Sequence, residues 1–300
     1  MAETVGIPEA RDSRGTVYGR AAIDADPCPF DRNDLVCGGC TLPVTAAKGH
    51  PRRVPGGGET WVSACFRRWP RQDRTHDEGC DFDFERRATE LISDSRGTLT
   101  KNGEHYELRL PQEAPSPQDA APERSGGTHG RIARLQVNAA SFRLAPTIRT
   151  AAGILRLLRR FAGSDDAVAR FRAVYGKKRL TWEQFCRPAS DAESIMKHLR
   201  GQRDRQHPLA VHGTVGLVSE SKQGSSFSLL DAYAGTVLHE GQERQVRVTV
   251  RSRNRAALRG AQQGDHWLAY GQWSYWVMDH VPRIEIQLWI DTPSSLVTWR

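Results

Sequence analysis

The chain has 300 residues, 38% of them hydrophobic, which is enough to bury at least one core and, by length, to form two domains. No run approaches about eighteen consecutive apolar residues, and charges interrupt the N-terminal segment, so neither a membrane-spanning helix nor a signal peptide is expected. We therefore predict a cytoplasmic protein whose six cysteines are reduced metal ligands or core groups. The net charge of +8 favours a polyanionic partner.

The N-terminal part of the chain changes character near Leu35. Residues 1–33 are rich in Ala, Asp, Arg and Pro without apolar periodicity, which predicts a loose N-terminal arm. Residues 34–110 are predicted to form a small zinc-binding module with a helix and a hairpin. The helix begins near Asp81, and the hairpin turns at Asn102-Gly103.

The middle of the chain is predicted to contain a linker and then a basic helical segment. Residues 111–130 are dense in Pro, Gly, Ser and Ala, which is typical of a flexible linker. Residues 131–206 are predicted to be a basic helical segment, in which two helices up to Phe185 precede a third at residues 190–200. Residues 131–200 hold fifteen Lys and Arg against five Asp and Glu, so the positive charge is concentrated here.

Residues 207–300 contain five strand-like runs, with the short helical run NRAALRGAQQG between the third and the fourth. This order of elements, together with the Gly-Asp pair before the fourth strand, resembles the OB-fold nucleic-acid-binding domains. The resemblance implies a five-stranded OB-like β-barrel. The whole chain is therefore predicted to be an α+β protein of several domains.

Four cysteines and one histidine in the N-terminal module have the spacing of a metal site. Cys37 and Cys40 form a C-x-x-C pair, and Cys65 and Cys80 follow. Zn²⁺ takes four nitrogen or sulfur ligands tetrahedrally, and a two-residue spacer lets one turn present both sulfurs. We predict a structural zinc site of these four cysteines, with His76 as the alternative fourth ligand because it precedes Cys80 at a suitable spacing.

Residues 33–84 resemble the N-terminal zinc-finger-like module of competence-associated CoiA-family nucleases. In that family a C-x-x-C pair is followed by a basic strand, a His-Phe-x-His motif and a cysteine. Here the sequence VSAC stands where the last histidine of the motif is expected, so the resemblance implies Cys65 as a ligand. The choice between Cys65 and His76 stays open at this point.

Basic and aromatic residues in the C-terminal half suggest a surface for nucleic acid. In RQVRVTVRSR the alternation places Val246, Val248 and Val250 on the core face, and Thr249 with the arginines on the opposite face. Aromatic rings beside a cationic groove stack on the bases of single strands. The predicted nucleic-acid-binding residues are Arg247, Arg251, Arg253, Tyr233, Trp273 and Tyr275 in this region, and Arg156, Arg160, Lys177 and Lys178 in the basic helical segment.

No catalytic motif is convincing. CoiA-like nucleases need paired carboxylates and a lysine for Mg²⁺, whereas the run DHVPRIEIQ offers Asp279 and Glu285 with Gln287 in place of the lysine. We therefore predict a non-catalytic protein that binds single-stranded DNA or RNA, in bacterial DNA processing or defence. Two alternatives remain: an adaptor that docks another protein in a larger assembly through the OB surface, and a divergent metal-dependent nuclease.

Overall fold

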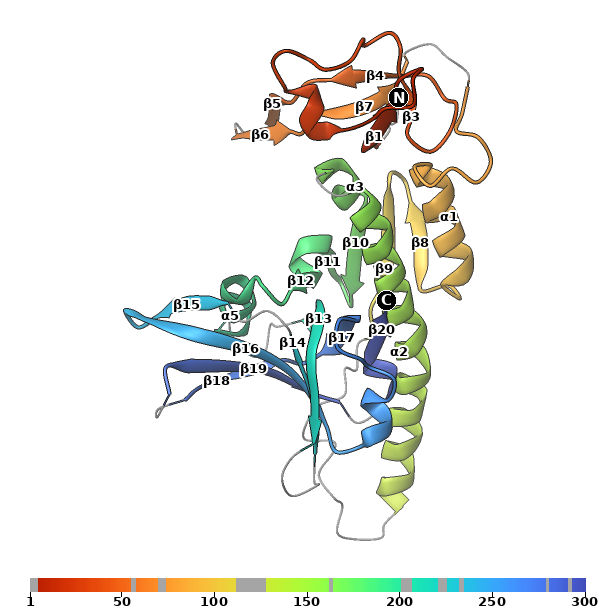
Figure 1. Cartoon of the computed structure of the whole chain (residues 1–300). Helices are drawn as coiled ribbons and strands as arrows, with labels where there is room; N and C mark the ends of the chain where they lie inside the picture. Colours follow the sequence, from red (N-terminus) through yellow and green to blue (C-terminus); the bar gives the residue numbers. More distant parts are fainter. Residues whose placement is uncertain are drawn as a thin grey trace. The chain divides into compact units, whose positions relative to one another are not determined.

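A computed structural model describes residues 5–54, 58–69, 74–111, 128–161, 164–200, 207–220, 226–231, 235–278, 281–290 and 293–300. The chain divides into two compact units (Figure 1). Unit 1 comprises residues 1–107 and 153–172, and unit 2 comprises residues 108–152 and 173–300. Within the described ranges, no helix has both the length and the apolar character needed to cross a membrane.

Unit 1 begins with small sheets built partly from residues that were predicted to be a loose arm. Strands β1 (Glu9–Arg11), β2 (Val17–Gly19) and β3 (Val36–Cys37) form a sheet in the order β2-β1-β3, and η1 (Arg20–Ile23) follows β2. The pairs β4 (Val44–Ala47) with β7 (Cys65–Arg68) and β5 (His50–Val54) with β6 (Gly58–Val62) complete this region. The structure differs from the prediction because Ile7, Ala10 and Ile23 are buried in the same core as Cys37 and Phe66.

The predicted helix and hairpin are both present. Helix α1 (Phe84–Asp94) begins at Asp83, whose side chain caps the helix by accepting a hydrogen bond from the backbone N–H of Arg86. Strands β8 (Leu99–Asn102) and β9 (His105–Arg109) follow. Gly103 between them has φ +60°, a conformation that glycine adopts without strain.

The basic helical segment is only partly helical. Helix α2 (Thr128–Arg160) is followed by the short α3 (Asp165–Ala169), and then by β10 (Phe171–Tyr175) and β11 (Lys178–Thr181), where continued helix was expected. Gly176, with φ +60°, makes the turn of this hairpin. The four-stranded sheet has the order β11-β10-β9-β8. Most of the predicted linker, residues 112–127, lies outside the described residues.

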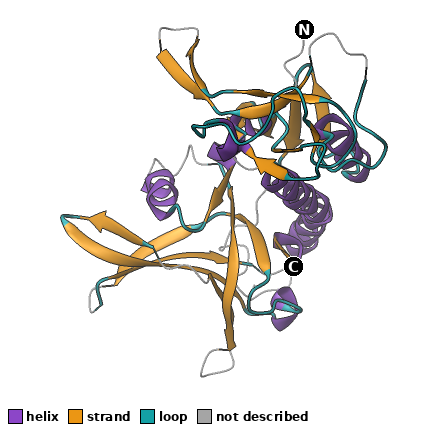
Figure 2. Cartoon of the chain, turned by 45° about the horizontal axis from the view of Figure 1, so that its top comes forward, coloured by secondary structure: helices purple, strands orange, loops and turns teal. Residues whose placement is uncertain are grey.

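The rest of unit 2 is dominated by one large sheet (strands orange in Figure 2). Its order is β18-β19-β16-β14-β13-β17-β20, with β12 pairing β13 and β15 pairing β16. The strands are β12 (Cys186–Pro188), β13 (Leu209–Glu220), β14 (Phe227–Asp231), β15 (Thr236–His239), β16 (Gln242–Ser252), β17 (His266–Gly271), β18 (Ser274–Met278), β19 (Arg283–Trp289) and β20 (Leu296–Trp299). The helices are α4 (Trp182–Phe185), α5 (Ala192–Arg200), η4 (Arg255–Leu258) and η5 (Pro293–Ser295).

All five predicted strand runs form strands, but the sheet is not the predicted five-stranded barrel. The fourth run makes two strands, β17 and β18, and the sheet gains β12, β15 and β20. Among the described residues no pairing joins β18 to β20, so a closed barrel is not seen. The short helix η4 lies between the third and fourth runs, as predicted.

The core of unit 2 lies on one face of this sheet. Val246, Val248 and Val250 are buried there, as the alternation of β16 predicts, together with Ile195 and Met196 of α5. Strand β19 runs parallel to β16 and adds its own apolar residues to the same core. The opposite face of β16 and β19 is therefore available for polar and aromatic side chains.

Candidate metal centre and arginine–tryptophan face

Three cysteines and one histidine converge in unit 1. One ligand atom from each of Cys37, Cys40, His76 and Cys80 lies within 4.8 Å of all the others. The Sγ atoms of Cys37 and Cys80 are 3.8 Å apart, and Nδ1 of His76 lies 3.4 Å from Sγ of Cys40 and 3.3 Å from Sγ of Cys80. This Cys₃His cluster can hold a metal ion.

The backbone around the cysteines forms two tight loops that bring the ligands together. Cys37 ends β3, and its N–H donates to the carbonyl of Leu42, while the N–H of Cys40 donates back to the carbonyl of Cys37. Gly39 lies between them, where an added Cβ would be only 3.1 Å from Sγ of Cys80. The close approach of Cys80 therefore leaves little room for a side chain at this position.

The two loops are joined by Asp77. Its Oδ2 accepts hydrogen bonds from the backbone N–H and the hydroxyl of Thr41, at 2.9 and 2.7 Å. These bonds lower the pKa of Asp77, because they stabilise the charged carboxylate. Thr41 directly follows Cys40, and Asp77 directly follows His76. The contact between Thr41 and Asp77 therefore holds Cys40 and His76 close to each other.

Burial favours the neutral forms of Cys37, Cys80 and His76. It raises the pKa of Cys37, and the neighbouring Cys80 and Cys40 raise it further. Burial also raises the pKa of Cys80 and lowers the pKa of His76. A divalent cation reverses this preference at the sulfurs, because thiolate is the form that binds metal.

The structure selects His76 rather than Cys65 as the fourth member of the cluster. Cys65 lies at the start of β7 and packs against Gly6, where an added Cβ would be 2.8 Å from its Sγ. The prediction of Cys65 as a ligand is corrected accordingly. The signal for His76 was present in the sequence, since three residues separate it from Cys80, but spacing alone did not decide between the two.

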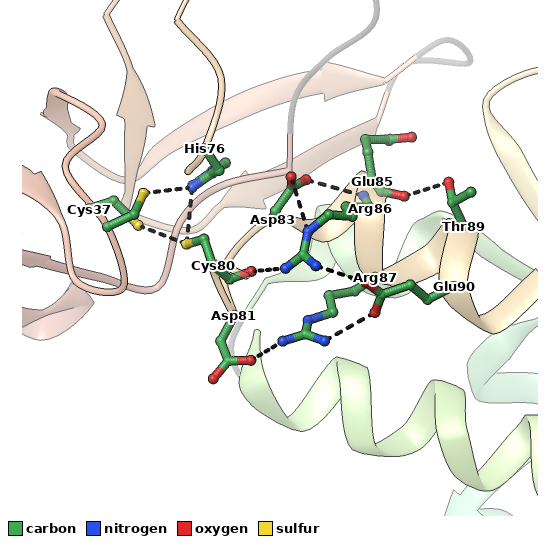
Figure 3. A network of polar contacts seen from close by, with 11 residues as sticks. Cys37, His76, Cys80, Asp81, Asp83, Glu85, Arg86, Arg87, Thr89 and Glu90 are labelled. Atoms are coloured by element: carbon green, nitrogen blue, oxygen red, sulfur yellow. Dashed lines mark hydrogen bonds and ion pairs between the residues drawn. The ribbon is translucent and has the colours of Figure 1, made fainter. Parts of the chain in front are cut away.

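An arginine of α1 forms a hydrogen bond with the backbone of Cys80, one of the residues of the cluster (Figure 3). Nη2 of Arg86 donates to the carbonyl of Cys80 at 2.8 Å, and Nη1 donates to Oε1 of Glu90 at 2.8 Å. The next residue, Arg87, pairs with Glu90 and with Asp81 but does not contact a ligand residue in Figure 3. Residues 76–80, which carry His76 and Cys80, are called the metal loop below. Helix α1 is thus attached to the metal loop through Arg86.

A second group of polar and aromatic side chains lies on the outer face of β16, β18 and β19 in unit 2. The parallel register places Arg251 beside Trp289 and Arg247 beside Glu285, and the antiparallel register places Trp276 on the other side of Glu285. The guanidinium of Arg251 lies 5.6 Å from the ring centroid of Trp276 and 5.9 Å from that of Trp289. We define the arginine–tryptophan face as Arg247, Thr249, Arg251, Arg253, Trp276, Glu285, Gln287 and Trp289.

This face is basic and has a polar floor. The guanidinium of Arg253, an exposed residue, also lies 5.9 Å from the ring centroid of Trp289. Arg251 forms an ion pair with Glu285, at 2.5 Å, so the three arginines exceed the acidic charge of the face. Below them Thr249, which is 1% exposed, and Gln287 are buried side by side, and Oγ1 of Thr249 and Oε1 of Gln287 have no hydrogen-bond partner among the described residues.

The other predicted nucleic-acid-binding residues fall in different places. Trp273 was expected to be exposed, but it is 6% exposed, belongs to the core of unit 2, and donates a hydrogen bond from its indole N–H to the carbonyl of Leu209. Tyr275 lies on the core face and is partly buried. Thr249 was placed correctly on the outer face, although it is buried there. Tyr233 lies outside the described residues.

The predicted basic residues of the middle segment lie on other elements than β16, β18 and β19. Arg160 in unit 1 forms an ion pair with Asp81, which offsets its positive charge. Arg156 is exposed on α2, and Lys177 and Lys178 are exposed at the turn between β10 and β11. The prediction missed Trp276 and Trp289, although both lie in runs that were predicted to be strands. Along β19, Trp289 alternates with Glu285 and Gln287, so the sequence placed it on the same face as these residues.

Comparisons with known proteins find similarity among solved structures. No family model matches the chain, and no curated protein matches it. A solved structure titled "Plasmodium falciparum SSB complex with ssDNA" matches with a TM-score of 0.21 and 14% sequence identity, over 33% of this chain and 99% of that chain. The resemblance of residues 33–84 to the CoiA family stays a prediction.

Proposed function

We propose that the protein binds single-stranded nucleic acid on the arginine–tryptophan face and that the Cys₃His cluster holds a structural zinc ion. The observation that carries the first part is the position of Trp289, whose ring lies within 6 Å of two guanidinium groups on the outer face of the sheet. Indole rings stack on bases with about 1–3 kcal/mol per base, and arginines pair with phosphates. Arg253 is exposed, so a base can take its place on the ring while its charge moves to the adjacent phosphate.

The strand pairing supports an OB-like arrangement as the scaffold. Strands β13, β14 and β16 pair as an antiparallel meander, β16 pairs with β19 in parallel, and β13 pairs with β17. The OB fold is a partly open five-stranded barrel of Greek-key type, and it binds oligonucleotides on one sheet face. The outer face of β16 and β19 is the corresponding surface in this proposal.

The distances within the cluster support zinc. Tetrahedral bonds of about 2.3 Å to sulfur and about 2.0–2.1 Å to nitrogen place two sulfurs about 3.8 Å apart, and sulfur and nitrogen about 3.6 Å apart. The Sγ–Sγ distance of 3.8 Å and the Sγ–Nδ1 distances of 3.4 and 3.3 Å are close to these edges. Four protein ligands leave no open position for water, so the ion contributes to folding rather than to chemistry.

Binding of fluorescent single-stranded oligonucleotides over a salt series tests the proposed function. Arg253→Gln should flatten the log–log salt dependence by about 0.7, the value for one phosphate contact on a single strand. Trp289→Ala should weaken binding at every salt concentration by about 5- to 150-fold, which corresponds to 1–3 kcal/mol. Trp61→Ala is the control, because Trp61 is an exposed tryptophan on β6 and lies outside the face.

Two results would overturn the assignment. If the protein did not retain single strands at low salt, or if Trp61→Ala and Trp289→Ala weakened binding equally, the face would not be the binding site. Capture of a protein partner through unit 2, without nucleic-acid binding, would favour the adaptor. Metal-dependent cleavage of the oligonucleotide would favour the nuclease alternative. The two carboxylates considered for that activity are Glu285, which is paired with Arg251, and Asp279, which lies outside the described residues.

A further inference from the structure

A pocket in unit 2 is lined by basic groups and by none of the residues of the arginine–tryptophan face. It has a volume of about 410 Å³ and lies where β12, α4 and α5 meet the residues before β13. The polar residues that line it are Gln184, Arg187, Ser194, Lys197, His198 and His207. No carboxylate is among the described residues that line it, and Asp191, 4.0 Å from Arg187, is the acidic partner that the structure gives this arginine.

Helix α5 presents two different faces. Ala192, Ile195 and Met196 are buried in the core of unit 2. Ser194, Lys197 and His198 are spaced by three and four residues, so they share the face that lines the pocket. Packing of the apolar face against the core therefore holds the helix in place, and the face with Ser194, Lys197 and His198 lines the pocket.

Two histidines of the pocket are held in fixed orientations. Their ring centroids are 4.6 Å apart. Nε2 of His198 lies 3.1 Å from the carbonyl oxygen of His207, and Nδ1 of His207 lies 3.1 Å from the carbonyl oxygen of Pro208. A carbonyl only accepts, so both of these nitrogens carry hydrogen, and Nδ1 of His198 and Nε2 of His207 are the nitrogens that gain a proton when the rings become charged.

The positive charge of the pocket acts on these rings. The pKa of His207 is lowered to about 4, mainly by burial and in part by charge repulsion from His198, Lys178 and Arg187. The pKa of His198 is lowered by burial and by Arg187 and Lys178 as well. Burial disfavours the charged form of both rings, and the positive charge of Lys178 and Arg187 disfavours it further.

We propose that this pocket binds a phosphate group through Arg187 and Lys197. An arginine fork and a lysine ammonium are the side chains that proteins use for phosphate oxygens, and Ser194 and Gln184 supply neutral donors beside them. Phosphate has two possible sources, a small phosphorylated molecule or the terminal phosphate of a nucleic-acid strand. The inference does not depend on the arginine–tryptophan face.

Titration of the full-length protein with inorganic phosphate tests the pocket. The histidine ring signals in NMR spectra are followed at constant ionic strength, with chloride as the comparison anion. We expect a saturable shift of the His198 and His207 signals with phosphate and none with chloride. Lys197→Gln and Arg187→Gln should each weaken phosphate binding at least five-fold, whereas Arg259→Gln, an exposed arginine of the same unit outside the pocket, should not change it.

Lys197 is exposed, so Lys197→Gln keeps the test valid if Arg187→Gln does not fold. No saturable shift with phosphate, or an equal effect of Lys197→Gln and Arg259→Gln, would overturn the proposal.

Oligonucleotides with a 5′-phosphate and with a 5′-hydroxyl separate the two sources. Preference for the phosphorylated strand that is lost in Lys197→Gln supports a strand end, and phosphate binding without this preference supports a small molecule. Trp289→Ala should leave phosphate binding unchanged, so this test fails or succeeds separately from the proposed function.

Discussion

Replacing Arg86 with methionine tests whether α1 is attached to the metal loop as described. Arg86 and Arg87 are adjacent, and each side chain is 30% exposed, but only Arg86 bonds to a ligand residue, through the carbonyl of Cys80. Methionine keeps much of the apolar stem and removes the charge. The pair of substitutions therefore separates the bond to the metal loop from the loss of a surface ion pair.

The expected magnitudes differ by more than the error of a melting experiment. A hydrogen bond from a charged donor contributes about 1.5–3 kcal/mol, and a partly exposed ion pair contributes about 0.2–1 kcal/mol. Arg86→Met, which loses this hydrogen bond and two ion pairs, should therefore lower the free energy of unfolding by about 2–5 kcal/mol. Arg87→Met, which loses two ion pairs, should lower it by about 0.4–2 kcal/mol. A difference of about 2 kcal/mol corresponds to roughly 8 °C in the melting temperature of a unit of this size.

Thermal unfolding of the zinc-loaded protein measures this difference. Competition with a coloured chelator measures zinc affinity in the same samples, and Arg86→Met should reduce it by about 10- to 100-fold, as is usual when a residue that orients a ligand is lost. Arg87→Met is the control and should keep the affinity. Equal melting temperatures and equal zinc affinities for the two variants would refute the role given to Arg86.

Three further predictions follow from named residues. Elemental analysis after chelator washing should find about one zinc per chain in the wild type and in Cys65→Ser, and much less in Cys80→Ser and His76→Ala; retention of zinc in His76→Ala would restore Cys65 as the ligand. Trp273→Ala should lower stability by about 3–5 kcal/mol in denaturant unfolding, because Trp273 is a core residue, whereas Trp289→Ala should cost much less; similar losses would contradict their different positions. Because the pKa of His207 is about 4 in the folded protein and about 6.5 when unfolded, the unfolded chain binds more protons between these values. Stability should therefore fall by up to about 3 kcal/mol as the pH drops from about 6.5 to about 4, and a His207→Asn variant with the same pH dependence would show that His207 is not the cause.

Local patterns predicted much of the fold. Strands β13, β14, β16 and β19, the short helix η4 and the turn at Gly103 follow from alternation and turn residues, which depend on neighbours in the sequence. The N-terminal strands β1 and β2 were not foreseen, since each has three residues and is fixed by packing against Phe66 and Cys37, which lie far along the chain. Tertiary contacts of this kind leave no periodic signal in a short segment.

The two candidate sites were predictable to different degrees. The cysteine spacing identified three ligands of the cluster, but the choice of His76 over Cys65 depends on how the loop after β7 returns to Cys40. On the sheet, alternation identified Arg247 and Arg251, but not which tryptophans lie beside them. That choice depends on the register of β19 and β18 against β16, which places Trp289 and Trp276 on the outer face and Tyr275 on the inner one.

Photochemical crosslinking tests the central claim of nucleic-acid binding most directly. A single-stranded oligonucleotide that carries 5-iodouracil reacts with aromatic side chains on which its bases stack, and mass spectrometry of the digested complex locates the modified residues. We predict crosslinks at Trp289 and Trp276, reduced by Arg253→Gln at moderate salt and unchanged by Trp61→Ala. Crosslinks confined to residues outside the arginine–tryptophan face, or none above the level of an unrelated basic protein, would contradict the account.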